Sequence, residues 1–449
     1  MNLYPPSFPC EKSVDSDTGS PIIQHRIKMK NKKDILRSLT KTGFFHIFGS
    51  SVINKIITFL SSVVIVRILT KEEYGVFTHA WNIYSIVILL NGLGAASAVI
   101  QLCSERSGDE VYGQKICGYA TRFGLLFDIL IAAVMLLIGT VVPLKIQGSA
   151  VLIRLLCVLP AIRLLFDLAC SYLRAQKRNR DFANLNTLNT IAVFGCTSIG
   201  ALILREKGMI WGYYAAFILT VLVAVFHYRI NLLPKVGLPS REDRHSLRSI
   251  AIVSMCNSSL SQLLYHIDIF ALGYVFPQEE IIAGYRVATL IPSALPFIPH
   301  ALITYVYPFF AEKRNDGAWC MQQYKRILLG MGGVNLAISA VLIVFAKPII
   351  ALLFGENYLD ILPIFRLLSL NYFIAGTFRT ISGNLLVTQR KLKYNFVVAL
   401  ISGSLNIAAD FLFLHWWGPI GAAIATIMVV LLTSVLNTGY LILTFRKNT

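Results

Sequence analysis

The sequence predicts an all-α, polytopic membrane protein with about twelve transmembrane helices in two six-helix lobes. Three observations predict it: 55% of the 449 residues are hydrophobic, only 14% are charged, and long apolar runs recur along the whole chain. A soluble protein carries roughly 25% charged residues. The mean hydropathy of +0.64 is therefore that of a chain whose surface faces lipid.

A helix needs about 20 mostly apolar residues to cross a bilayer. Twelve runs of this kind stand in the sequence, at 44–67, 75–101, 118–142, 149–173, 183–204, 208–229, 247–274, 281–308, 327–354, 359–386, 394–414 and 419–444. We expect five parts from their spacing: a cytoplasmic basic segment, partly disordered (1–42), an N-lobe (43–229), a cytoplasmic linker (230–246), a C-lobe (247–445) and a cytoplasmic tail (446–449).

The basic residues predict how the chain lies in the membrane. If the N-terminus lies inside, 29 of the 41 Lys and Arg residues fall on the inner side, six on the outer side and six within helices. Cytoplasmic loops carry such an excess of positive charge. We therefore expect a multi-pass protein of the cell (inner) membrane with both termini cytoplasmic. The net charge of +18 then faces anionic membrane lipid rather than nucleic acid.

The two lobes show signs of a parallel repeat. Residues 69–75 resemble 276–285, residues 153–156 resemble 365–368, and residues 175–178 resemble 388–391. The offsets are all about 210 residues, as expected for two repeated halves with a binding site between them. Similar loop composition at basic inner helix ends is the alternative explanation.

Six cations lie within the predicted helices: Lys55, Arg154, Arg163, Arg286, Arg366 and Arg379. Each charge at a helix centre costs about 2.5–3.5 kcal/mol on insertion scales, so these side chains must face a bundle interior or water. The acids in the helices are Asp128, Asp167, Asp268 and Asp410. If every acid pairs with a cation, two cations remain, and the interior is expected to suit an anionic ligand.

Depth in the helices separates these cations. Lys55 and Arg163 lie near helix centres and are expected to contact a phosphate-like group. The alternative for Arg163 is an ion pair with Asp167, four residues later on the same helix.

The other four cations lie nearer helix ends. We expect an outer electropositive ring from Arg154, Arg286 and Arg366, and a cavity contact from Arg379. Arg154 and Arg366 could instead extend outward to the membrane surface.

Three carboxylates are candidate coupling-ion sites: Asp128, Asp268 and Asp410. A carboxylate inside the membrane can bind a proton or Na⁺. An ion pair with a nearby arginine is the alternative for each.

No enzyme motif stands in the sequence. It has no Walker A, HExxH or GxSxG sequence and no paired Cys/His spacing for zinc. We expect no enzyme activity, no cofactor and no metal site.

Residues 67–77 (RILTKEEYGVF), 91–94 (NGLG) and 173–178 (LRAQKR) resemble Wzx-type polysaccharide flippases of the MOP superfamily, which also holds MATE exporters and lipid II flippases. The twelve-span plan extends the resemblance over about residues 40–449. It implies movement of an undecaprenyl-diphosphate-linked oligosaccharide from the inner to the outer leaflet by alternating access. A polysaccharide polymerase and co-polymerase are then possible partners. The family pattern does not account for the polar N-terminal extension.

Three other functions remain open. A MATE-like drug or cation antiporter would be expected to have an acidic cavity, whereas cations outnumber acids here. A lipid II flippase usually has more spans. A membrane polymerase or ligase acting on glycans would need a large outer loop, which this chain lacks.

Overall fold

The computed structural model describes residues 44–106, 108–234 and 237–448, and every regular element in these residues is a helix. The expected all-α fold is confirmed for this part of the chain. The expected basic segment 1–42 lies outside the described residues, as does Thr449 of the tail.

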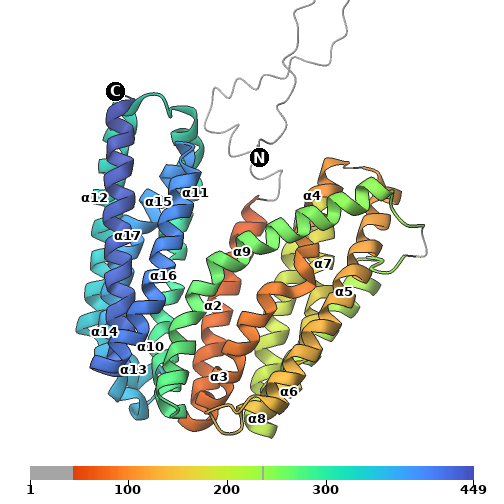
Figure 1. The fold of residues 1–449 in the computed structure, drawn as a ribbon, viewed down its shortest axis with the longest axis horizontal. Coiled ribbons are helices and arrows are strands. Elements are labelled where there is room, and N and C mark those ends of the chain that lie inside the picture. The colour runs from red at the N-terminus through yellow and green to blue at the C-terminus, as the bar shows by residue number, and fades with distance from the viewer. Residues whose placement is uncertain (1–43, 107, 235–236, 449) are drawn as a thin grey trace, which may run out of the picture. The chain divides into compact units, whose positions relative to one another are not determined.

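The first bundle is formed by the elements that precede residue 227 (Figure 1). They are α2 (Phe44–Ile68), α3 (Lys71–Val87), η1 (Ile88–Gly94), α4 (Ala95–Glu105), α5 (Glu110–Val141), α6 (Ser149–Leu156), α7 (Leu159–Ala175) and α8 (Asn179–Phe226). Helix α7 packs against α4, α5 and α8, and so lies at the centre of this bundle.

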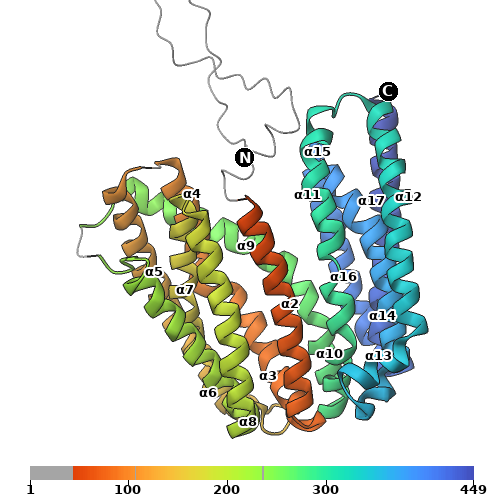
Figure 2. The same cartoon turned by 180° about the vertical axis from the view of Figure 1, so that it is seen from behind.

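The second bundle is formed by the elements after residue 278 (Figure 2). They are α10 (Glu279–Ala294), α11 (Phe297–Glu312), α12 (Gly317–Val344), α13 (Ala346–Leu353), η2 (Glu356–Ile361), α14 (Leu362–Ile374), η3 (Ala375–Arg379), α15 (Thr380–Thr388), α16 (Leu392–Trp417) and α17 (Pro419–Lys447). Helix α17 packs against α12, α14 and α16.

Helix α9 (Arg241–Val275) joins the bundles and packs against α3 and α4 of the first and α16 of the second. It begins inside the segment expected as a linker, because the Ser240 hydroxyl accepts a hydrogen bond from the Asp243 N–H and caps the helix. The linker's irregular backbone therefore ends at Ser240.

By length and composition, nine of the described helices are able to cross a membrane, or ten if the bent pair α6 and α7 is one span. This count does not confirm the expected twelve. Helix α9 is not among these helices, because polar residues stand in its middle (257–268) as well as charged ones at its start. Helix α8 counts once although its 48 residues would be about 72 Å long if straight, far more than a bilayer core.

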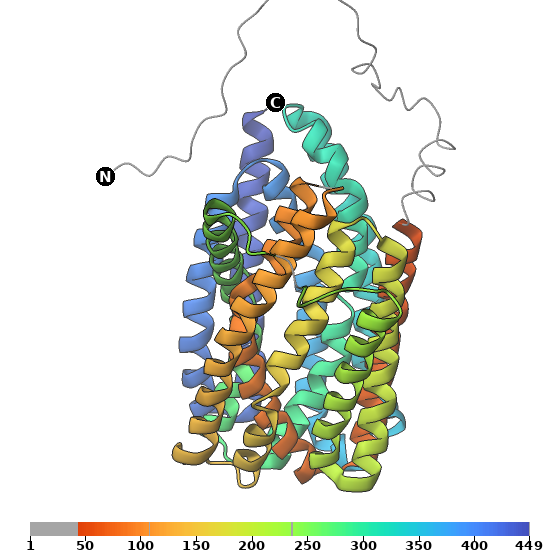
Figure 3. The same ribbon diagram turned by 90° about the vertical axis from the view of Figure 1, so that its right-hand side faces the viewer.

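Helix α8 folds back on itself at Leu204 and Arg205, whose backbone is not helical. Its two arms then touch along small residues: a Cβ on Gly208 would lie 1.9 Å from the Gly200 carbonyl oxygen. Figure 3 shows the arms side by side in yellow-green. The two arms correspond to the expected spans 183–204 and 208–229.

A break between α3 and α4 separates these helices at the NGLG sequence. Gly92, Leu93 and Gly94 all have positive φ, which glycine adopts without strain. The buried carboxylate of Asp128 on α5 accepts a hydrogen bond of 2.8 Å from the freed Gly92 N–H. Asp128 therefore satisfies a backbone group that lipid could not.

At one end of the helices three cations of the first bundle make contacts, two with the second bundle and one with α9. The Arg67 guanidinium donates to the carbonyl oxygens of Ala351 (3.0 Å) and Leu353 (2.9 Å), and also to that of Leu352, in the last turn of α13. A cation is favoured there, because the carbonyls at a helix C-terminus carry partial negative charge.

The other two cations have different partners: Lys71 pairs with a carboxylate, and Lys145 binds a carbonyl in the last turn of α9. Lys71 Nζ lies 2.7 Å from an Asp360 carboxylate oxygen, and Lys145 Nζ donates to the Tyr274 carbonyl oxygen at 2.6 Å. We call the interactions of Arg67, Lys71 and Lys145 the closed-end contacts. Arg67 and Lys71 hold the two bundles together where α2 ends and α3 begins, and Lys145 holds the connection between α5 and α6 to α9.

Helices α3 and α10 approach each other most closely at Gly75. A Cβ there would lie 2.0 Å from the carbonyl oxygen of Glu279, a backbone atom that cannot turn aside. Only glycine therefore allows the bundles to meet at this distance.

Gly75→Val should lower the stability of the purified protein by about 1–3 kcal/mol, the usual cost of overpacking. Gly333→Val is the matched control, because a Cβ on Gly333 of α12 meets nothing within 4 Å. Thermal unfolding in detergent measures both. Equal midpoints for the two variants would contradict the close approach at Gly75.

Asp128→Ala should destabilise the protein by about 1–3 kcal/mol, because the Gly92 N–H loses its acceptor inside the bundle. Asp128→Asn keeps an acceptor oxygen and should retain most of the stability. The same thermal measurement compares them. Equal losses in both variants would show that the charge of Asp128, rather than its hydrogen bond, matters.

Candidate functional site

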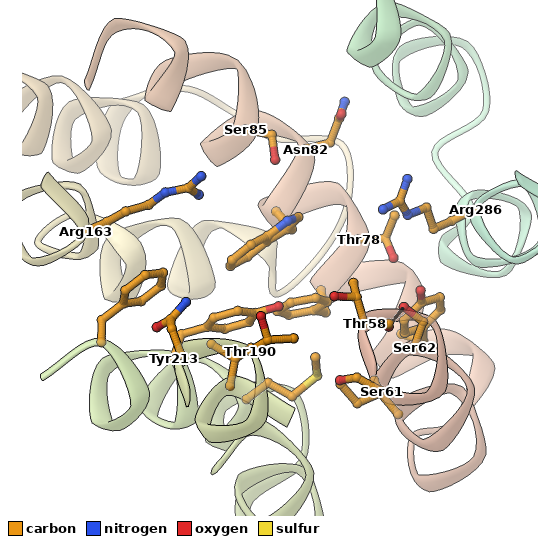
Figure 4. A pocket seen from close by; sticks show the side chains of 18 of the residues that line it. Thr58, Ser61, Ser62, Thr78, Asn82, Ser85, Arg163, Thr190, Tyr213 and Arg286 are labelled. Carbon is orange, nitrogen blue, oxygen red and sulfur yellow. Dashed lines mark hydrogen bonds between the residues drawn. The ribbon is translucent and has the colours of Figure 1, made fainter. Parts of the chain in front are cut away.

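A cavity of about 470 Å³ lies where the bundles face each other, within the size range of small-molecule sites. Most of its wall comes from α2, α3, α7 and α8 of the first bundle. Ile269 of α9 and Arg286 of α10 complete it. Figure 4 shows Arg163 and Arg286 entering from opposite sides.

Arg163 of α7 lies in this wall beside Asp167, one helical turn later. The Arg163 Nε and an Asp167 carboxylate oxygen are 3.7 Å apart, so the pair attracts but is too long for a hydrogen bond. Both side chains keep more than a third of their surface exposed. The two predictions for Arg163, cavity contact and ion pair, thus describe the same arrangement.

Arg286 is the second cation of the cavity wall. It interacts with the Tyr74 hydroxyl of α3, and it belongs to none of the ion pairs found among the described residues. Its positive charge is therefore not neutralised by an acid of the described wall.

An aromatic stack lines the cavity between these cations. Trp81 lies over Tyr213 with ring centroids 4.3 Å apart and over Phe77 at 5.5 Å, each pair at an angle of 24°. Stacked rings are rigid and present a flat apolar face with polar tips.

Hydroxyl and amide groups form much of the remaining wall beside apolar side chains, and sequence reasoning missed them. Helix α2 contributes Thr58, Ser61 and Ser62, and α8 contributes Asn186, Asn189 and Thr190. In both helices the spacing is i, i+3, i+4, which places the side chains on one face. Polar residues at that spacing within an apolar run could have predicted this polar helix face from the sequence.

Lys55 and Arg379 do not belong to the described cavity wall. Lys55 is exposed, but it stands three and seven residues before Thr58 and Ser62, so it extends the cavity face of α2 by one turn. Arg379 is half-buried in the second bundle, at the end of the π-helical turn η3.

Arg154 and Arg366 are exposed and also lie outside the described wall. The Arg366 Nε donates to the Ile343 carbonyl oxygen at 3.2 Å, at the C-terminal end of α12. Arg154 packs its side chain near Gly139 at the end of α5. These positions favour the alternative given for both residues, an outward-facing cation near a helix end.

The three candidate coupling acids lie in two places. Asp128 is part of the α3–α4 break described above. Asp268 of α9 and Asp410 of α16 lie together where these helices pack, and the Asn406 amide donates to one oxygen of each, at 3.0 and 2.9 Å. No ion pair among the described residues includes any of the three.

Two further hydroxyls surround the pair of acids. Thr426 donates to Asp268 at 2.9 Å, and Tyr285 lies 3.4 Å from the same carboxylate. The second oxygen of Asp410 is buried and has no hydrogen-bond partner in the described part of the chain. Within the described residues no cation pairs with this cluster of hard oxygen atoms.

Comparison with known proteins places the fold in a family. Residues 64–363 match the family model described as "Polysaccharide biosynthesis protein". The chain is 23% identical to the lipopolysaccharide biosynthesis protein WzxC of Escherichia coli K12, with 83% of this chain and 75% of the relative covered. It is 24% identical to the EPS I polysaccharide export inner membrane protein EpsE of Ralstonia solanacearum, covering 82% and 85%.

The fold also resembles solved structures. An inward-facing multidrug resistance MATE transporter of the MOP superfamily superposes with a TM-score of 0.73 at 15% identity, covering 88% of this chain and 95% of that one. The expected MOP-type, multi-pass membrane architecture is confirmed. The chain belongs to the family described as "Polysaccharide biosynthesis protein".

Proposed function

We propose that this protein moves an undecaprenyl-diphosphate-linked oligosaccharide from the inner to the outer leaflet of the cytoplasmic membrane. The observation that carries the proposal is a cavity between two bundles that has one unneutralised arginine, Arg286, beside a wall of aromatic, hydroxyl and amide groups. A pyrophosphate suits a guanidinium fork, and a glycan suits the polar and aromatic wall. The relatives named for polysaccharide biosynthesis and export support it.

The closed-end contacts suggest how the substrate moves. By the distribution of positive charge, Arg67, Lys71 and Lys145 stand on the outer side. The contacts then close the outer end of the cavity while the substrate enters from inside. Breaking them and rocking the bundles would expose the cavity outside. The inner-membrane location with both termini cytoplasmic is part of this proposal.

A transporter of this kind needs no covalent chemistry, so we propose that the protein is not an enzyme. A polymerase and co-polymerase that consume the exported unit are proposed partners. A MATE-like exporter of cations is less favoured, because the described cavity wall holds two arginines and only one acid, Asp167. The lipid II flippase alternative has no observation of its own in this structure.

Arg286→Gln should reduce surface polysaccharide at least tenfold and cause lipid-linked repeat units to accumulate inside, because the cavity loses its unneutralised cation. Arg366→Gln is the matched control: it removes the same charge from a side chain outside the cavity wall. Polysaccharide and lipid-linked units are measured at matched protein levels. A normal polysaccharide level in Arg286→Gln would contradict the proposal.

The energy source that we propose is an ion bound by Asp268 and Asp410. Two carboxylates around one amide repel each other unless a proton or cation joins them. The carboxylate and hydroxyl oxygens are hard ligands suited to Na⁺, and the two carboxylates would also hold a shared proton. Because α9 and α10 carry Asp268 and Tyr285 and also pack against α3, ion binding can bias the contact between the bundles.

Asp410→Asn and Asp268→Asn should each abolish the dependence of transport on an ion gradient in proteoliposomes. Asp128→Asn is the control, since its carboxylate holds the backbone of Gly92. Transport is measured with a Na⁺ gradient and, separately, with a pH gradient, which identifies the ion. Gradient-driven transport that persists in both cluster variants would overturn the coupling role.

A further inference from the structure

The cavity divides into a part with net positive charge and a part that is neutral. Arg286 carries its charge on the second-bundle side, whereas Arg163 on the first-bundle side stands beside Asp167. An anion at Arg163 would also approach the Asp167 carboxylate, which repels it. The two arginines therefore differ in the ligand that they favour.

We propose that Asp167, Arg163 and Asn186 form a subsite that recognises the hydroxyl or acetamido groups of a neutral sugar next to the pyrophosphate. This proposal rests on the proposed function and assigns the two ends of the same substrate to opposite walls. Arg286 then holds the pyrophosphate, and the first bundle reads the sugar.

The geometry of the Arg163–Asp167 pair leaves Asp167 available, and the guanidinium of Arg163, which also interacts with the Tyr84 hydroxyl, has further N–H groups to donate. Their 3.7 Å separation exceeds the 2.7–3.2 Å range of N–H···O hydrogen bonds. Neither group therefore satisfies its hydrogen-bonding capacity on the other. A sugar hydroxyl both donates and accepts, so it can donate to Asp167 and accept from Arg163 at once.

Asn186 adds a donor and an acceptor from α8. Its side-chain amide lines the cavity and makes no hydrogen bond among the described residues. By contrast, Asn189 one turn away accepts a hydrogen bond from Thr220 at 3.2 Å and is already used inside the bundle. Asn186 is thus the amide of this face that remains free for a ligand.

The aromatic stack supplies the apolar half of sugar recognition. Trp81 is half-buried, and its stacking on Tyr213 fixes the ring in place. The C–H face of a sugar ring can pack on such a surface while its hydroxyls reach polar groups at the edge. Both kinds of group line the same cavity.

A binding experiment on the full-length protein tests whether the first bundle recognises the sugar while Arg286 binds the pyrophosphate. The probes are undecaprenyl diphosphate without sugar and the same lipid carrying one N-acetylhexosamine or one neutral hexose. Native mass spectrometry in detergent gives the affinity for each probe. The wild-type protein should bind at least one sugar-bearing lipid about tenfold more tightly than the bare lipid.

Asp167→Asn should remove this sugar preference and leave the affinity for the bare lipid unchanged, and Asn186→Ala should reduce it in part. Arg286→Gln should weaken the binding of all probes by the same factor. The control is Asp181→Asn, which disrupts another same-helix Arg–Asp pair, with Arg178, outside the cavity wall.

The outcomes separate the two proposals. If the wild-type protein binds no probe, the proposed function itself fails. If it binds the bare lipid but gains nothing from any neutral sugar, or if Asp167→Asn and Asn186→Ala both keep the gain, the sugar subsite is wrong while the transport function stands. Loss of the sugar preference in Asp167→Asn, with the preference kept in the control Asp181→Asn, supports the subsite.

Discussion

A charged side chain cannot lie in hydrocarbon without a partner or water, and this constraint organises the whole molecule. The cations in the helices satisfy this constraint in different ways. Arg163 and Arg286 face the cavity, Arg366 binds a carbonyl oxygen at a helix end, and Lys55 is exposed on the cavity face of α2. The buried acids meet it through hydrogen bonds to a backbone N–H, an amide and hydroxyls.

The two bundles have different roles in this account. The first bundle supplies most of the cavity wall and all three cations of the closed-end contacts. The second bundle supplies the unneutralised Arg286 and Asp410, whose carboxylate shares the Asn406 amide with that of Asp268 on α9. Substrate binding and ion binding can then shift the same equilibrium between two arrangements of the bundles. Each ligand shifts it because it binds one arrangement more tightly than the other.

Apolar runs and residues 67–77 were enough to predict the all-α membrane fold and the family. The same residues now have structural reasons: Thr70 caps α3 through Glu73, Lys71 binds Asp360, and Gly75 lets α10 approach. The sequence could not show that Asn406 joins Asp268 to Asp410, since these residues lie 138 and 4 positions away from it. Hydropathy did separate the two arms of α8 into the expected spans 183–204 and 208–229, because the charged residues Arg205, Glu206 and Lys207 stand at the turn between them.

Reversible locking of the closed end tests the central claim of alternating access most directly. Cysteines would replace Lys71 and Asp360, whose side chains meet at 2.7 Å, in a chain whose native cysteines are replaced. A cleavable thiol crosslinker then joins the bundles, and flipping of a lipid-linked sugar is measured in proteoliposomes. The account predicts that crosslinking stops flipping and that cleavage restores it. Undiminished flipping by the fully crosslinked protein would contradict it.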